Sequence, residues 1–464
     1  MYQTKQSATV AVIIHPYLKG KDGYHGSYHQ RARLEEARGL AAAIHLDVRH
    51  AESISVTKPR PATYLGQGTV ERLADLVKDL NAELVIIDAH ISPGQQRNLE
   101  KSWNAKVIDR TGLILEIFGE RAQTREGQMQ VELAHLNYQK SRLVRSWTHL
   151  ERQRGGFGFL GGPGETQIEI DRRLIGERIA KLKKELETVT RMRELHRKAR
   201  KKVPYPIVAL VGYTNAGKST LFNKLTQSSV VAMDQLFATL DPTMRQLRLP
   251  SGRTTILSDT VGFVSDLPHE LVAAFRATLE EVLEADVIVH VRDIAHPETE
   301  EQKKDVEDVL LQLGIEISAA DANHASSQSV HRPVLEALNK IDLLDDQTSD
   351  AIKTKVNRST DQVALSAVTG EGTNTLLDKL DSELSKHRQA LGVRIPLKDG
   401  ETLAWLYRRG EVLSRRDGEQ DAELTVLLDT ADVARLEKRG ISASLAAECV
   451  VPFPPALRRR LPKF

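Results

Sequence analysis

Apolar residues recur along the first hundred residues of the chain with two different spacings. Short runs of consecutive apolar residues, many of them β-branched, are typical of buried strands. These runs lie at residues 10–15, 84–88 and 106–109. Apolar residues at three- and four-residue intervals, which predict amphipathic helices, lie at residues 29–45, 70–80 and 93–103. The alternation predicts a small, mostly parallel sheet with helices packed on it.

Two long helical patterns follow this region. Residues 112–150 are mostly helical in pattern. Residues 166–202 carry an apolar stripe from Ile168 onward, and near their start lie Thr166 and Glu169. These two residues have the spacing of a capping box, which predicts the start of a helix. We expect the two helices to pack as a hairpin. From residue 392 the order is strand, helix, strand, strand, helix, which predicts a small two-layer α+β unit.

The bulk composition is that of an ordinary globular protein. The 464 residues are 40% hydrophobic and 28% charged, and the formal net charge is only +2. The single cysteine, Cys449, has no internal disulfide partner, which suits a reducing compartment. The apolar run at 8–14 is too short to span a membrane. We expect a cytoplasmic monomer without a membrane span.

A strong local charge is hidden by the near-neutral total. Residues 140–202 contain eighteen Lys and Arg against eight Asp and Glu. Within them, residues 155–165 are too rich in glycine for a stable helix or strand. Aromatic side chains beside arginine suit RNA, where bases stack on rings and guanidinium groups meet phosphate. The candidate RNA contacts are Arg154, Phe157, Phe159 and Leu160. The alternative is a flexible linker whose apolar residues pack on a neighbouring segment.

The clearest chemical motif follows an apolar run at residues 207–211. It reads Gly212, Tyr213, Thr214, Asn215, Ala216, Gly217, Lys218, Ser219, a G-x-x-x-x-G-K-S phosphate-binding loop. A helical pattern at 219–225 completes the strand, loop and helix that this motif requires. Backbone N–H groups would face the phosphates, Lys218 would reach the β- and γ-phosphates, and Ser219 would bind Mg²⁺. A chance glycine-rich turn is the alternative.

Two further segments have the order and spacing of nucleotide-sensing loops. The first comprises Phe237, Ala238, Thr239, Leu240 and Asp241, and the second Asp259, Thr260, Val261 and Gly262. Thr239 would bind Mg²⁺, Asp259 would hold it through water, and the Gly262 N–H would reach the γ-phosphate. We therefore expect Lys218, Thr239 and Gly262 to be the catalytic residues.

The last two segments predict which base is bound. They are Asn339, Lys340, Ile341 and Asp342, after an apolar run at 334–338, and Ser366, Ala367 and Val368. The Asp342 carboxylate can accept two N–H bonds from guanine, whereas adenine offers no such pair of donors. Ser366 and its neighbours would support guanine from the other side. Five segments in this order predict a guanine-nucleotide site. Glu336 is unexpected within its apolar strand, and we expect an edge or capped position for it.

Two residues depart from the pattern of signalling GTPases. Phe263 stands where those proteins carry the glutamine that orients the attacking water, and phenylalanine has no group for this task. Another group must position the water, or hydrolysis is slow until a partner helps. Asn215 occupies the position at which some GTPases bind K⁺ beside the β-phosphate. A turn-stabilising role for Asn215 is the alternative.

The sequence therefore predicts a multidomain α/β protein. Its parts are an N-terminal α/β subdomain at 1–110, a helical hairpin with the glycine-rich loop at 111–203, a Ras-like P-loop GTPase domain with a mostly parallel sheet at 204–387, and a small C-terminal α+β domain at 392–464. The polar insert at 320–330 is expected to be a surface loop of the GTPase domain.

These motifs resemble the HflX family of translation-associated GTPases. The glycine-rich loop continues into residues 166–173, and this junction, with the segments at 234–243 and 259–263, carries the resemblance over residues 8–385. It is weaker in the last eighty residues. The resemblance implies binding of GTP or GDP with Mg²⁺, contact with the large ribosomal subunit and its RNA, and splitting or rescue of ribosomes under stress. The glycine-rich loop would approach the peptidyl-transferase region.

Three functions are compatible with the residues alone. The first is a GTP-hydrolysing protein that binds the large (50S) ribosomal subunit. The second is a GTP-dependent switch or scaffold that binds a protein other than the ribosome. The third is an accessory GTPase for RNA modification, which would need a companion active site. Phosphate contacts weaken steeply with salt, so salt dependence separates RNA from protein binding.

Overall fold

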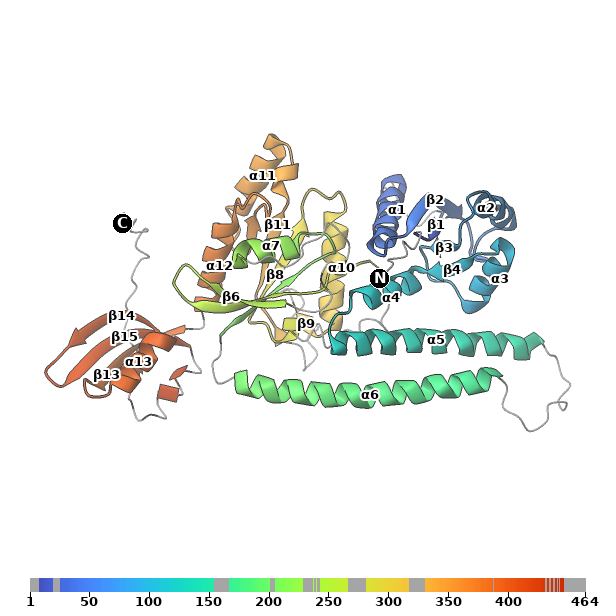
Figure 1. Ribbon diagram of the computed structural model, residues 1–464. Helices are drawn as coiled ribbons and strands as arrows, with labels where there is room; N and C mark the ends of the chain where they lie inside the picture. Colours follow the sequence, from blue (N-terminus) through green and yellow to red (C-terminus); the bar gives the residue numbers. More distant parts are fainter. Residues whose placement is uncertain are drawn as a thin grey trace, which may run out of the picture. The chain divides into compact units, whose positions relative to one another are not determined.

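The computed structural model divides the chain into two compact units, Met1–Leu380 and Asp381–Phe464 (Figure 1). The structure describes residues 8–19, 26–153, 167–200, 205–227, 237, 239, 243–265, 281–316, 330–386, 388–429, 432–433, 435–436, 439, 441 and 443–445. No helix within these residues is both long and apolar enough to cross a membrane.

The first unit begins with a parallel four-stranded sheet. Its strands are β1 (Val10–Leu18), β2 (Asp47–Val56), β3 (Leu84–Ile87) and β4 (Lys106–Asp109), in the order β2-β1-β3-β4. The sequence pattern predicted β1, β3 and β4 but missed β2. This strand lies at the edge of the sheet. Most of its side chains are polar, and only two of its residues are buried. It therefore lacks the continuous apolar run on which the prediction relied.

Helices cover both faces of this sheet. They are α1 (Gly26–Ala43), α2 (Gln67–Asp79) and α3 (Pro93–Trp103). Side chains alternate between the faces of a strand, so Ile13 of β1 packs in one core with Leu40 of α1. Ile14 packs in the opposite core, with residues of α2 and α3 such as Leu73 and Leu99.

Three helices follow the sheet. They are α4 (Arg110–Arg121), α5 (Arg125–Gln153) and α6 (Gln167–Arg200). The expected continuous helix over 112–150 is thus two helices, with a break between Arg121 and Arg125. Helices α5 and α6 lie side by side, as the hairpin prediction required (Figure 1). One exposed contact between them is bidentate, because Arg178 Nε and Nη2 donate to the two oxygens of Glu132 at 2.7 and 2.9 Å.

A second, six-stranded sheet forms the rest of the first unit. Its strands are β5 (Ile207–Val211), β6 (Thr243–Arg248), β7 (Thr254–Asp259), β8 (Val287–Asp293), β11 (Val334–Asn339) and β12 (Gln362–Ala364), in the order β12-β11-β8-β5-β7-β6. All neighbouring pairs are parallel except β6 with β7. The carboxyl ends of the parallel strands therefore meet at one edge, where α/β sheets bind ligands.

Shorter elements accompany this sheet. The helices are α7 (Lys218–Thr226), α10 (Thr299–Gln312), α11 (Asp346–Val356) and α12 (Thr373–Ser385), with a 3₁₀ turn at Ile341–Leu343. A short parallel pair joins β9 (Ile315–Glu316) to β10 (Val330–His331). Most of the expected surface insert, residues 317–329, lies outside the described residues.

Glu336 does not lie at a sheet edge, contrary to the expectation from its neighbours. Strand β11 runs between β8 and β12, so Glu336 is in the interior of the sheet. Its Oε2 accepts a hydrogen bond from Arg292 Nη1 at 3.0 Å, and its carboxylate also pairs with Lys303 of α10. Burial alone would lower the pKa of Lys303, but Glu336 raises it. The Glu336 carboxylate is stabilised by these two cations, which only the folded chain brings next to it.

The second unit contains a four-stranded antiparallel sheet and helix α13. Its elements are β13 (Arg388–Pro396), α13 (Gly400–Arg409), β14 (Glu411–Asp417), β15 (Asp421–Asp429) and β16 (Ala443–Leu445), and the sheet order is β14-β15-β13-β16. Its core contains Ile395, Leu406 and Leu424. The predicted fold class, a multidomain α/β protein with a small α+β unit at its C-terminal end, is confirmed.

Candidate nucleotide site

The phosphate-binding loop connects β5 to α7, and two of its glycines are required by their surroundings. Gly212 has φ +150°, and a Cβ there would lie 2.2 Å from the Val291 carbonyl oxygen. Gly217 has φ +92°, and its Cβ would lie 2.2 Å from Asn339 Nδ2. Any side chain at either position would collide with β8 or with the end of β11. The loop therefore approaches these strands more closely than other residues permit.

Lys218 is buried at the centre of this loop. Its Nζ donates hydrogen bonds to the carbonyl oxygens of Gly212 and Tyr213 at 3.0 and 2.7 Å. Burial lowers the pKa of Lys218 to about 8, although Asp259 acts to raise it. A phosphate group in the loop would supply the negative charge that this amine needs.

The structure brings together the three predicted Mg²⁺ ligands. Ser219 Oγ and Thr239 Oγ1 both donate to Asp259 Oδ2, at 2.7 and 2.8 Å, and the two hydroxyl oxygens are 2.9 Å apart. Burial raises the pKa of Asp259, while Ser219, Lys218 and Thr239 act to lower it. Among the described residues, Asp259 Oδ1 has no hydrogen-bond partner. Converging oxygen atoms with an unsatisfied buried carboxylate oxygen fit a hard divalent cation such as Mg²⁺.

Gly262 lies directly against the phosphate-binding loop. A Cβ at this position would lie 2.8 Å from Thr214 Cγ2 and 3.0 Å from Lys218 Nζ. The next residue, Phe263, pairs with the loop backbone: Thr214 N–H donates to the Phe263 carbonyl at 2.7 Å, and Phe263 N–H to the Gly212 carbonyl at 3.2 Å. The Phe263 side chain is buried in the apolar core. Its ring is therefore packed among apolar residues and has no role in holding water.

Asn339 joins the phosphate-binding loop to the predicted base-binding segment. Its Nδ2 donates to the Ala216 carbonyl at 2.8 Å, and its Oδ1 accepts from Ala367 N–H at 2.9 Å. Lys340 Nζ pairs with Asp293 Oδ2 at 2.7 Å. Asp342, the predicted base-reading residue, is exposed in the 3₁₀ turn.

The remaining predicted residues divide into two groups. Thr260, Val261, Ile341 and Ser366 are buried, Val368 is exposed, and Phe237 is buried beside Thr239. Ala238, Leu240 and Asp241 lie outside the described residues, as do the candidate RNA contacts Arg154, Phe157, Phe159 and Leu160.

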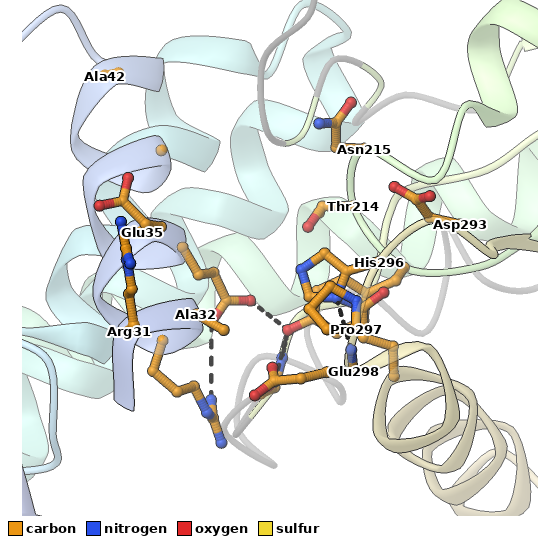
Figure 2. Close-up of a pocket in the computed structure, with 16 residues that line it drawn as sticks. Arg31, Ala32, Glu35, Ala42, Thr214, Asn215, Asp293, His296, Pro297 and Glu298 are labelled. Atoms are coloured by element: carbon orange, nitrogen blue, oxygen red, sulfur yellow. Dashed lines mark hydrogen bonds and ion pairs between the residues drawn. The ribbon is translucent and has the colours of Figure 1, made fainter. Parts of the chain in front are cut away.

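A cavity of about 530 Å³ lies beside the phosphate-binding loop (Figure 2). Thr214 and Asn215 line it from the loop, and Arg31 and Glu35 line it from α1. Thr214 Oγ1 is buried and has no hydrogen-bond partner among the described residues. Asn215 has φ +58°, a left-handed conformation that asparagine tolerates.

Sequence patterns missed the part that α1 and α4 play in this region. Tyr213 of the loop hydrogen-bonds Glu36 of α1, and Arg110 at the start of α4 donates to the carbonyl oxygen of Ser265. These contacts join residues 177 and 155 positions apart. No local pattern contains such information.

Four family models match successive parts of the chain. Their descriptions are GTP-binding GTPase N-terminal at residues 31–119, GTP-binding GTPase Middle Region at 121–200, 50S ribosome-binding GTPase at 207–322, and HflX C-terminal domain at 351–446. A GTPase HflX from Magnetococcus marinus is 50% identical over 404 residues, which cover 87% of this chain and 90% of that protein. The chain belongs to the HflX family of GTPases.

A second HflX relative, from Escherichia coli, is 40% identical over 442 residues, which cover 95% of this chain and 98% of that protein. The likeness to HflX therefore extends beyond residue 385, where the motifs alone indicated less. A solved GTP-binding protein from Sulfolobus solfataricus in complex with GDP is 23% identical and has a TM-score of 0.42. The match covers 82% of this chain and 99% of that one. The predicted family and the predicted GTPase activity are confirmed by the HflX relatives.

Proposed function

We propose that this HflX GTPase binds the large ribosomal subunit in its GTP-bound form and helps to separate or rescue ribosomes. The observation that carries the proposal is the match of residues 207–322 to a 50S ribosome-binding GTPase. The local excess of positive charge over residues 140–202 supports it, because RNA binding depends on neutralising phosphates.

The nucleotide site contributes positioning and charge. GTP would lie with its phosphates in the loop from Gly212 to Ser219, where Lys218 places a cation beside the β- and γ-phosphates. Ser219 and Thr239 would hold Mg²⁺ directly and Asp259 through water. Bound there, Mg²⁺ would neutralise the charge that develops on the phosphates. The exposed Asp342 would select guanine.

The attacking water needs an orienting group that Phe263 does not provide. The Phe263 ring is buried in the apolar core, so hydrolysis by the isolated protein is expected to be slow until a partner completes the site. We propose that the large ribosomal subunit is this partner. Asn215 as a ligand for K⁺ stays a prediction that hydrolysis in KCl against NaCl would test.

The hairpin supplies the reach that such a partner requires. Helix α6 has 34 residues, so at 1.5 Å per residue it extends about 50 Å. Residues 154–166, with the predicted RNA contacts Phe157 and Phe159, connect it to α5. We propose that GTP hydrolysis is coupled to ribosomal RNA through this arm.

The test measures GTP hydrolysis with and without purified large subunits. The starting protein is expected to be stimulated, and a Phe157→Ala/Phe159→Ala variant to lose the stimulation while it still binds GTP. Leu311→Ala, which removes an exposed apolar side chain from α10, is the matched control and should behave as the starting protein. Separation of subunits is followed in parallel on sucrose gradients.

The salt dependence decides between RNA and protein recognition. If binding depends on several phosphate contacts, raising the salt concentration from 50 to 200 mM should weaken it by a factor of about 10³ or more. Absence of stimulation, together with no GTP-dependent co-sedimentation with the subunit, would contradict the proposal. Stimulation by a non-ribosomal protein, insensitive to salt, would favour the switch or scaffold function.

A further inference from the structure

Helix α4 contacts the predicted nucleotide-sensing segment at 237–241 and the backbone three residues beyond the segment at 259–262. Its first residue, Arg110, reaches the backbone just after Gly262, and Phe118, two turns further on, packs against the residue two positions before Thr239. Neither contact belongs to the five sequence motifs. Both come from the N-terminal region, which the motifs did not connect with catalysis.

The contact of Arg110 is buried and involves all three guanidinium nitrogens. The residue is 5% exposed, and its Nε and Nη2 donate to the Ser265 carbonyl at 3.3 and 3.1 Å. Its Nη1 donates to Asp88 and its Nη2 also to Glu36, each at 2.7 Å. Burial alone would lower the pKa of Arg110, but the two carboxylates raise it, so the guanidinium keeps its charge.

Ser265 is held from its amide side as well. Its N–H donates to the Tyr213 hydroxyl at 2.8 Å, and Tyr213 in turn hydrogen-bonds Glu36. Both peptide groups of Ser265 are thus tied to α1, α4 and the phosphate-binding loop. Gly262 lies three residues before this attachment, and between them Phe263 pairs with the backbone of the phosphate-binding loop.

The contact of Phe118 acts on the other segment. The rings of Phe118 and Phe237 meet edge to face, with centroids 4.7 Å apart and planes at 79°. Phe237 is 2% exposed and has φ +57°, a left-handed conformation that is unusual for a bulky side chain. Tertiary packing must stabilise such a conformation. Phe118 therefore helps to set where the chain places Thr239.

We propose that Arg110 and Phe118 are positioning residues for GTP hydrolysis, supplied to the site by the N-terminal region of the same chain. Arg110 keeps Gly262 against the phosphate-binding loop, and Phe118 keeps Thr239 beside Ser219 and Asp259. The inference rests on the roles proposed above for Thr239 and Gly262. It does not depend on ribosome binding, because it concerns hydrolysis by the isolated protein.

The first test uses Arg110→Lys in the full chain. Lysine keeps the positive charge for Asp88 but cannot reproduce the forked contact with Ser265 and Glu36. Because small displacements of catalytic groups cost rate, kcat for GTP should fall by about tenfold or more while KM changes little. Arg72→Lys, at an exposed ion pair with Glu52 in the same region, is the control and should leave kcat unchanged.

The second test is a double-mutant cycle between Phe118→Leu and Phe237→Leu. If the two rings act through their contact, the double variant should be no slower than the slower single variant. Each single variant should need more Mg²⁺ for half-maximal rate, since Thr239 is displaced. A purely structural role would lower the melting temperature without this change in Mg²⁺ dependence.

Thr239→Ala separates the two ways in which the inference can fail. If Thr239→Ala leaves hydrolysis and its Mg²⁺ dependence unaltered, the proposed site roles are wrong. If Thr239→Ala is inactive while Arg110→Lys and Phe118→Leu hydrolyse GTP within about twofold of the starting protein, the positioning role is overturned. If the effects of Phe118→Leu and Phe237→Leu on the hydrolysis rate multiply in the double variant, the positioning role of Phe118 is also overturned.

Discussion

Lys218 illustrates how burial changes the chemistry of a single side chain. Its amine is enclosed by the phosphate-binding loop and touches two backbone carbonyls. Burial disfavours its charged form, and its pKa falls to about 8, although Asp259 opposes the shift. The free protein therefore loses the charge that GTP needs as the pH rises through about 8, well below the range of an ordinary lysine.

This shift predicts a pH dependence of nucleotide binding. Bound phosphates favour the protonated amine of Lys218. Above about pH 8 the amine of the free protein is mostly neutral, so binding of GTP should be accompanied by uptake of a proton. The Kd for GTP should then rise by up to about tenfold per pH unit. Titration calorimetry in two buffers of different ionisation enthalpy, from pH 7 to 9.5, measures both effects.

The control for this experiment is Lys304→Ala, which removes an exposed lysine from α10. It should keep the pH profile of the starting protein. A Kd that stays constant up to pH 9.5, without proton uptake, would show that Lys218 has an ordinary pKa.

At the scale of elements, one buried carboxylate connects two helices. Asp109 caps the start of α4 by accepting from Gly112 N–H at 2.9 Å, and it accepts from the Tyr138 hydroxyl of α5 at 2.6 Å. Arg142 of α5 pairs with the same carboxylate at 2.5 Å. Burial and Asp109 both raise the pKa of Tyr138. The middle of α5 is thus fastened to the start of α4, the helix that contacts the predicted nucleotide site.

Removing the Tyr138 hydroxyl should loosen this attachment. Tyr138→Phe leaves the buried Asp109 with one donor fewer, so the free energy of unfolding should fall by about 1–3 kcal/mol. Urea denaturation measures the loss, and amide hydrogen exchange should increase in α5. Tyr205→Phe, at a tyrosine that is 42% exposed, is the control. Equal losses in the two variants would mean that the bond to Asp109 contributes nothing specific.

At the scale of the whole molecule, the chain has two units with separate cores. Among the described residues, the core of the second unit is formed by side chains between positions 391 and 441, without any from the first unit. Every predicted nucleotide-site residue belongs to the first unit. A chain that ends at residue 386 should therefore unfold cooperatively on its own. It should also hydrolyse GTP within about twofold of the full chain.

Calorimetry and a GTPase assay on this shortened chain check the prediction. The second unit, produced as residues 388–464, should be folded separately by circular dichroism. Aggregation of the first unit, or a large loss of its hydrolysis rate, would show that the units depend on each other.

The features that could be predicted are those encoded by residues close together in the sequence. The five nucleotide-site segments are short, and each acts through backbone geometry or one side chain at a defined place in its own segment. Their spacing alone therefore predicted the site, and the structure brings Ser219, Thr239 and Asp259 together. Strand β2 escaped prediction because an edge strand with polar residues has no apolar run to reveal it.

By itself, the sequence determined the GTPase motifs, many of the strands and helices, and the likeness to HflX. These features depend on residues close together in the chain. Only the tertiary structure decided that Glu336 pairs with Arg292 and that Arg110 and Phe118 of α4 contact Ser265 and Phe237. Such contacts join residues far apart in sequence, and their free energy depends on burial and geometry that appear only when the chain has folded.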